Sequence, residues 1–226
     1  MNFSIIVIFE SFVPLSRTFF IYLDYNATVP PIADALRAMN DVISLPFNAS
    51  ATHALGRKAK LYKDNAKQQI LDFVNLSVKN YKIVFTSSGT EANNLVIKNF
   101  YQENIIISAI EHLSIFEHAK NHDSIKVAKV LSTGIIDLED LDFLLASATG
   151  KILVSVMIAN NETGVIQPIA EIAKLCKKYK AFIHSDCSQL PGKIDIDLSE
   201  LDLDFITLSG HKLGATVGIG ALIMKS

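Results

Sequence analysis

Short apolar runs rich in β-branched residues alternate along the chain with longer segments of helical periodicity. The apolar runs predict strands near residues 81–86, 104–109, 125–130, 152–158, 181–185, 204–208 and 219–224. The helical spacing predicts helices over 30–44, 54–75, 90–101, 112–121, 137–146 and 167–180. Parallel strands need a long crossover, which a helix supplies, so this alternation indicates an α/β fold with a mostly parallel seven-stranded sheet and helices on both faces.

Composition limits the size of the domain and the classes of partner. A length of 226 residues fits one large domain. With 21 basic and 23 acidic residues, the net charge of −2 gives no electrostatic reason to expect nucleic acid or an anionic membrane as a partner. The sequence has two cysteines, Cys176 and Cys187, which predict a reducing, cytoplasmic location and no disulfide framework.

Residues 1–20 differ in character from the rest of the chain. Residues 3–9 are apolar, but no basic stretch precedes them and no clear small-residue cleavage site follows. The run is also shorter than the roughly 20 apolar residues that cross a bilayer. An extra strand or a disordered leader is therefore favoured over a signal peptide or a membrane span.

Polar clusters follow five of the predicted strands. They are Thr86–Glu91, Glu111-His112, Asn160–Glu162, Asp186 with Gln189, and Ser209–Lys212. Ligands of open α/β sheets bind outside the carboxyl ends of the strands. The sequence therefore predicts one ligand site at this edge, with no metal ligands among its residues.

Lys212 and Asp186 suggest the chemistry of that site. Lys212 is predicted just after the end of a strand, close to Ser209 and His211. A lysine in this position is suited to hold an aldehyde cofactor as a Schiff base, because partial burial lowers the pKa of its amine. An aspartate can pair with a protonated pyridine nitrogen. These are the two protein groups that pyridoxal phosphate chemistry needs most.

Gly89 and Thr90 stand where a strand passes into a helix. Gly89 lets the backbone approach a ligand closely, and the helix N-terminus, with the Thr90 hydroxyl, suits a phosphate. The ordinary alternative is a helix N-cap with Glu91 in the first turn.

The remaining polar residues also have two interpretations each. His112 can stack on a flat ring or occupy the first turn of a helix, and Asn161 can contact a phenolic oxygen or form a turn. Gln189 and Ser209 can contact the cofactor or act as capping groups, and His211 can bond the phosphate or sit against a neighbouring loop. A nucleophilic role for Cys187 is disfavoured, because no histidine lies at a convincing position to activate it.

In order and spacing, these segments resemble the cysteine desulfurases, the sulfur-mobilising branch of the class V aminotransferase-like family. The similarity runs from about Ile21 to the C-terminus. The matching segments are Tyr22–Thr28, Asn48–Ser50 with His53 and Gly56, Phe85–Asn94, Glu111-His112, Asn160–Gly164, His184–Asp186 with Gln189, and Ser209–Lys212.

The resemblance implies the large domain of a fold type I transferase dependent on pyridoxal phosphate, over residues 21–226. It implies that Lys212 carries the cofactor and that Asp186 pairs with the pyridine nitrogen. Lys212 and His112 are then the catalytic residues, with His112 stacked on the ring. The other implied contacts are Asn161 and Gln189 with the phenolic oxygen, and Gly89, Thr90, Ser209 and His211 with the phosphate.

The implied reaction converts L-cysteine to alanine and passes sulfur, as a persulfide on an enzyme cysteine, to iron–sulfur cluster or thionucleoside assembly. A homodimer and a sulfur-acceptor or scaffold protein are the implied partners. The family continues beyond the point that corresponds to Ser226, with the nucleophilic cysteine and a carboxylate-binding arginine, and it has Gly-Pro in place of Ala215-Thr216.

Two hypotheses follow from the expectation that the chain is C-terminally truncated. It is either the large half of a working desulfurase, completed by another polypeptide, or an inactive fragment that retains cofactor binding. A nucleotide-binding α/β module is a weaker alternative, because no Gly-x-Gly-x-x-Gly motif follows an early strand.

Overall fold

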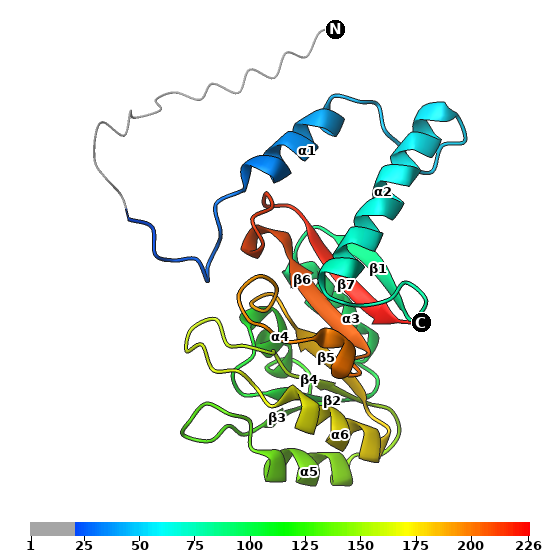
Figure 1. The fold of residues 1–226 in the computed structure, drawn as a ribbon. Coiled ribbons are helices and arrows are strands. Elements are labelled where there is room, and N and C mark those ends of the chain that lie inside the picture. The colour runs from blue at the N-terminus through cyan, green and yellow to red at the C-terminus, as the bar shows by residue number, and fades with distance from the viewer. Residues whose placement is uncertain (1–20) are drawn as a thin grey trace, which may run out of the picture.

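The computed structural model describes residues 21–226, and the predicted leader over residues 1–20 lies outside the described residues (Figure 1). The helices are α1 (Ala33–Ile43), α2 (Ala54–Phe73), α3 (Gly89–Asn99), α4 (Leu113–Ala119), α5 (Leu138–Ser147) and α6 (Ile169–Tyr179). The strands are β1 (Tyr81–Thr86), β2 (Asn104–Ser108), β3 (Ile125–Ala128), β4 (Ile152–Ser155), β5 (Phe182–Asp186), β6 (Phe205–Ser209) and β7 (Gly220–Lys225). Each predicted helix and strand is present.

The seven strands form one sheet in the order β1-β7-β6-β5-β4-β2-β3. The pairs from β6 across to β3 are parallel, which confirms the predicted fold class. Strand β7 runs antiparallel to both of its neighbours, β1 and β6. The connection from β6 to β7 holds no α-helix, only the short 3-10 helix η2 (Gly210–Lys212), so the chain turns back instead of crossing over.

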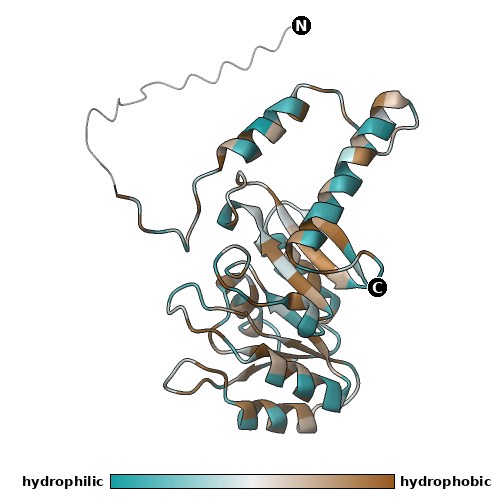
Figure 2. Ribbon diagram, viewed as in Figure 1, coloured by the Kyte–Doolittle hydropathy of each residue, from teal (hydrophilic) through white to brown (hydrophobic). Residues whose placement is uncertain are grey.

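Successive side chains of the central strands point to opposite faces of the sheet and build two apolar cores. In β2, Ile106 packs with α5 and α6 residues, whereas Ile105 and Ile107 pack with α3 and α4 residues. Cys176 of α6 is buried in the first core. Figure 2 shows hydrophobic residues concentrated on the strands, between the two helical layers.

Helices α1 and α2 are the least covered elements. Helix α1 has no buried residue, and α2 buries only Gly56, Ala59 and Leu71. In Figure 1 both extend away from the layered part of the molecule. Over residues 21–226, none of the helices combines the length and apolar character needed to cross a bilayer.

Candidate active site

A pocket of about 420 Å³ lies at the carboxyl edge of the sheet. All five polar clusters predicted from the sequence contribute to its wall. The predicted site residues that line it are Gly89, Thr90, His112, Asn161, Asp186, Gln189, Ser209, His211 and Lys212. Asp24, Asn26 and Ala27 of the N-terminal segment close another side of it.

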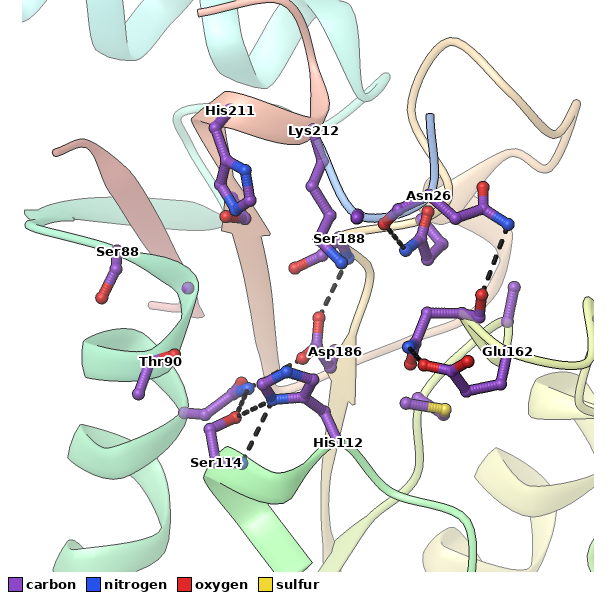
Figure 3. Close-up of a pocket in the computed structure, with 18 of the residues that line it drawn as sticks. Asn26, Ser88, Thr90, His112, Ser114, Glu162, Asp186, Ser188, His211 and Lys212 are labelled. Carbon is purple, nitrogen blue, oxygen red and sulfur yellow. Dashed lines mark hydrogen bonds between the residues drawn. The ribbon is translucent and has the colours of Figure 1, made fainter. Parts of the chain in front are cut away.

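Lys212 is the last residue of η2 and extends into the pocket above Asp186 (Figure 3). Its side chain is half-buried, and this burial lowers the pKa of the ammonium group. The carboxylates of Asp186, Glu162 and Asp24 act in the opposite direction and favour the charged form. A lowered pKa increases the fraction of neutral amine that can attack a carbonyl carbon.

Asp186 is the last residue of β5, and its side chain is held rigidly. One carboxylate oxygen accepts a hydrogen bond from Asn93 Nδ2 at 2.7 Å and the other from the backbone N–H of Ser188 at 3.0 Å (Figure 3). The residue is only 8% exposed, so its carboxylate is a buried group and not a solvated loop side chain. Asn93 also donates to Ser114 Oγ at 2.9 Å, which ties α3 and α4 to the floor of the pocket.

His184 lies two residues before Asp186 on the same face of β5. Its Nδ1 is 2.8 Å from Ser155 Oγ on β4, and its Nε2 is 3.0 Å from Thr207 Oγ1 on β6. Complete burial lowers the pKa of the imidazole to about 4, so the ring is neutral. The neutral ring, bonded on both sides, therefore links β4, β5 and β6 two residues before Asp186.

The first turn of α3 forms the N-cap expected from its sequence and also lines the pocket. Ser88 is an N-cap that accepts from Glu91 N at 3.1 Å, and the Glu91 carboxylate accepts from Ser87 N at 2.6 Å. Gly89 and Thr90 meanwhile line the pocket. A Cβ at Gly89 would lie 3.0 Å from the Ser209 Cβ, so glycine allows β6 and α3 to approach closely.

His112 likewise caps a helix and lines the pocket. Its Nδ1 accepts the backbone N–H of Ser114 at 3.1 Å at the start of α4 (Figure 3). Because Nδ1 is the acceptor in that bond, it carries no proton. The cap fixes the imidazole at the pocket wall, where ring stacking remains a prediction.

His211 lies against a neighbouring loop, which was one of its two predicted roles, and Asn161 bonds the residue that follows it. His211 Nδ1 is 3.0 Å from Thr28 Oγ1, and its backbone carbonyl accepts from Val29 N at 2.9 Å. Asn161 Nδ2 donates to Glu162 Oε1 at 2.7 Å. Each of the two residues therefore lines the pocket with one polar side-chain atom already paired, Nδ1 of His211 and Nδ2 of Asn161.

Neither cysteine suits a nucleophilic role. Cys187 is fully buried, and burial raises the pKa of its thiol to about 12. Cys176 is 2% exposed, and its thiol pKa is raised to about 12 for the same reason. Within residues 21–226, no cluster of three or more potential ligands could hold a metal ion.

Comparison with known proteins identifies the family. The model of the class V aminotransferase family matches residues 21–226. The chain belongs to this family. Enzymes of the family depend on pyridoxal phosphate.

The most similar members include cysteine desulfurases. The chain is 37% identical to cysteine desulfurase IscS of Ehrlichia chaffeensis, over 91% of this chain and 52% of the relative. It is 36% identical to the mitochondrial cysteine desulfurase of Candida albicans, over 91% of this chain and 44% of the relative. The chain therefore spans about half the length of the curated relatives it matches.

Solved structures of related proteins have the same fold. A NifS-like protein from Rickettsia africae aligns with a TM-score of 0.89 at 46% identity, over 92% of this chain and 58% of that structure. SspA in complex with cysteine aligns with a TM-score of 0.78 at 29% identity, over 90% of this chain and 60% of that structure.

Several residues that shape this pocket were not among the predicted site residues. Asn93, Ser114 and Ser188 orient the predicted site residues through hydrogen bonds. Gly220 allows close packing, since a Cβ there would lie 2.4 Å from the backbone carbon of Ser88. In the sequence, Gly218 and Gly220 at the start of the predicted strand indicate that another segment of backbone can approach closely there.

Glu111 is the other unassigned group, a buried carboxyl between the ends of β2 and β4. Its two oxygens accept from Met157 N at 2.9 and 3.0 Å, and Ser108 Oγ donates to one of them. Burial raises the pKa of Glu111 to about 8, although these hydrogen bonds oppose the shift. The folded protein therefore keeps a proton on Glu111 that the unfolded chain releases above pH 4.5.

We expect stability to fall as pH rises between these two pKa values, because the folded state binds the extra proton. The contribution is about 1.4 kcal/mol for each pH unit. Urea unfolding at pH 5.5 and 7.5 should show a loss that is about 2–3 kcal/mol larger in the parent than in Glu111→Gln. The exposed Glu171→Gln serves as the control, and an equal loss in parent and Glu111→Gln would contradict the assignment.

Proposed function

We propose that the chain binds pyridoxal phosphate through Lys212 and acts in a cysteine desulfurase, which converts L-cysteine to alanine and passes the sulfur to iron–sulfur cluster or thionucleoside assembly. The observation that carries this proposal is the placement of a half-buried lysine over a buried, hydrogen-bonded aspartate in one pocket. The similarity to cysteine desulfurases over 91% of the chain supports it.

The residues of the pocket fit the cofactor. The pocket offers an amine, a fixed carboxylate and a helix N-terminus lined by hydroxyl groups, which suit an aldehyde, a pyridine nitrogen and a phosphate respectively. Gly89 at that helix N-terminus lets Ser209 and Ser188 lie close to it, since a Cβ there would be 3.0 Å from the Ser209 Cβ. When bound, pyridoxal phosphate supplies an electron-withdrawing ring that stabilises negative charge on the substrate carbon.

Each of the predicted site residues has a defined role in this proposal. Asp186 holds a proton on the ring nitrogen, and His112 covers one face of the ring. Lys212 holds the aldehyde carbon and then moves protons at the substrate carbon. The phosphate is held by Gly89, Thr90, Ser209 and His211, and the phenolic oxygen by Asn161 and Gln189.

The group that accepts the sulfur is not one of the two cysteines of this chain, because both thiols are buried and have raised pKa values. The resemblance places the nucleophilic cysteine and the carboxylate-binding arginine in the part of the relatives that this chain does not match. The burial of both thiols favours a second candidate, cofactor binding by residues 21–226 without transfer of sulfur to either cysteine.

We propose a cytoplasmic homodimer as the working form. Apolar side chains on α2 support association, since Leu61 is 59% and Phe73 60% exposed. On α1, Ile43 is 70% exposed. Apolar surface of this extent favours contact with another protein surface.

A titration of the purified chain with pyridoxal phosphate tests the proposed function. We expect visible absorbance to develop and the melting temperature to rise, because a ligand of the folded state stabilises it by about 2.7 kcal/mol at a hundred times its Kd. Pyridoxamine phosphate, which lacks the aldehyde, should stabilise the chain without forming a bond to lysine. Absence of both absorbance and stabilisation with pyridoxal phosphate would contradict the proposal.

A further inference from the structure

Lys193 connects two parts of the pocket wall. Its ammonium group donates to Gln189 Oε1 at 2.7 Å and to the backbone carbonyl of Tyr25 at 3.2 Å. Lys193 lies in the loop after β5, four residues after Gln189. Partial desolvation of the ammonium group and the nearby charge of Lys212 lower the pKa of Lys193.

The contact with Lys193 sets the orientation of the Gln189 amide. An ammonium group can only donate hydrogen bonds, so the atom of Gln189 that faces it must be the oxygen. The nitrogen Nε2 is then on the other side, where it donates to Asn26 O at 2.8 Å. Nε2 carries two hydrogens, and one of them bonds Asn26 O. Because Gln189 lines the pocket, the other hydrogen is available to a ligand.

The same two residues hold the segment Asp24–Thr28 against the pocket. Lys193 bonds the carbonyl of Tyr25, and Gln189 bonds the carbonyl of Asn26. The far end of the segment is held by the contact of Thr28 with His211. Asp24, Asn26 and Ala27 line the pocket, so this segment forms part of its wall.

We propose that Lys193 is a positioning residue, which makes Gln189 a hydrogen-bond donor toward an acceptor oxygen of the bound ligand and holds the segment Asp24–Thr28 in place. This inference rests on the proposed function for the identity of that oxygen, the phenolic oxygen of pyridoxal phosphate. The part that concerns the segment depends only on the contacts within the chain.

The ligand-dependent part is tested with Lys193→Met, which keeps most of the side-chain volume but removes the donor. We expect the Kd for pyridoxal phosphate to rise about three- to tenfold, as loss of one oriented hydrogen bond implies, and the absorbance maximum of the bound cofactor to shift. Lys193→Arg retains a donor and should restore both values. Lys178→Met removes an exposed lysine that pairs with Asp142 and should change neither.

The ligand-free part is tested by amide hydrogen exchange in the absence of cofactor. We expect faster exchange over residues 25–29 in Lys193→Met than in the parent or in Lys178→Met. If the parent fails to bind pyridoxal phosphate but this exchange difference appears, the proposed function is wrong and the positioning of the segment stands. If the parent binds the cofactor and Lys193→Met matches it in Kd, absorbance and exchange, the inference is overturned.

Discussion

Replacement of Lys212 with alanine is expected to abolish the covalent attachment of pyridoxal phosphate. Lys212 is the half-buried lysine at the centre of the pocket, and burial lowers its pKa toward the range in which an amine attacks an aldehyde. After incubation with cofactor and reduction by borohydride, mass spectrometry should show one labelled site per parent chain and background labelling in Lys212→Ala.

Lys178→Ala is the matched control for this variant, since Lys178 is an exposed lysine far from the pocket wall that pairs with Asp142. It should label like the parent. Equal labelling of Lys212→Ala and the parent would mean that another lysine carries the cofactor.

Replacement of Asp186 is expected to have the second largest effect, on the binding and spectrum of the cofactor. A hydrogen bond to a charged group contributes about 1.5–3 kcal/mol. Asp186→Ala should therefore raise the Kd for pyridoxal phosphate by roughly ten- to a hundredfold. It should also shift the absorbance maximum, because the ring nitrogen loses the carboxylate that stabilises its proton.

Asp186→Asn separates charge from shape in this experiment. The amide has nearly the same size, so it retains packing next to Asn93 and Ser188 but cannot stabilise a protonated ring. We expect the spectral shift in both variants and the smaller loss of affinity in Asp186→Asn. The exposed Asp142→Asn should match the parent, and parent-like binding and spectrum in Asp186→Ala would exclude the pairing with the ring nitrogen.

The periodicity of the sequence was sufficient to predict the elements of the fold. Strands such as 152–155 bury both faces and helices such as 169–179 bury one, so their apolar patterns differ clearly. The direction of β7 was not predictable in this way, because apolar pattern is the same for parallel and antiparallel neighbours. The short connection through η2 decides it.

The residue types at the strand ends predicted which side chains gather at the pocket, but not how they are oriented. Asp186 lies at the end of a strand, whereas its partner Asn93 lies in α3, 93 residues earlier in the sequence. Lys193 and Thr28 were missed for the same reason. Their contacts with Gln189 and His211 join segments whose proximity only the folded chain establishes.

At α3 and α4 the structure confirms the capping interpretation, and the ligand contacts stay predictions. Ser88 and His112 cap helices, and these caps place the first turns at the pocket. A helix cap and a ligand contact use different atoms of the same segment, so one does not exclude the other. At Cys187, in contrast, burial leaves only the structural role.

The central claim is that Lys212 carries pyridoxal phosphate in this pocket, and peptide mapping of the borohydride-reduced parent chain tests it most directly. The account predicts that the cofactor mass appears on the peptide that contains Lys212 and that prior addition of pyridoxamine phosphate protects it from labelling. A label distributed over exposed lysines such as Lys178 and Lys120, with no protection, would contradict it.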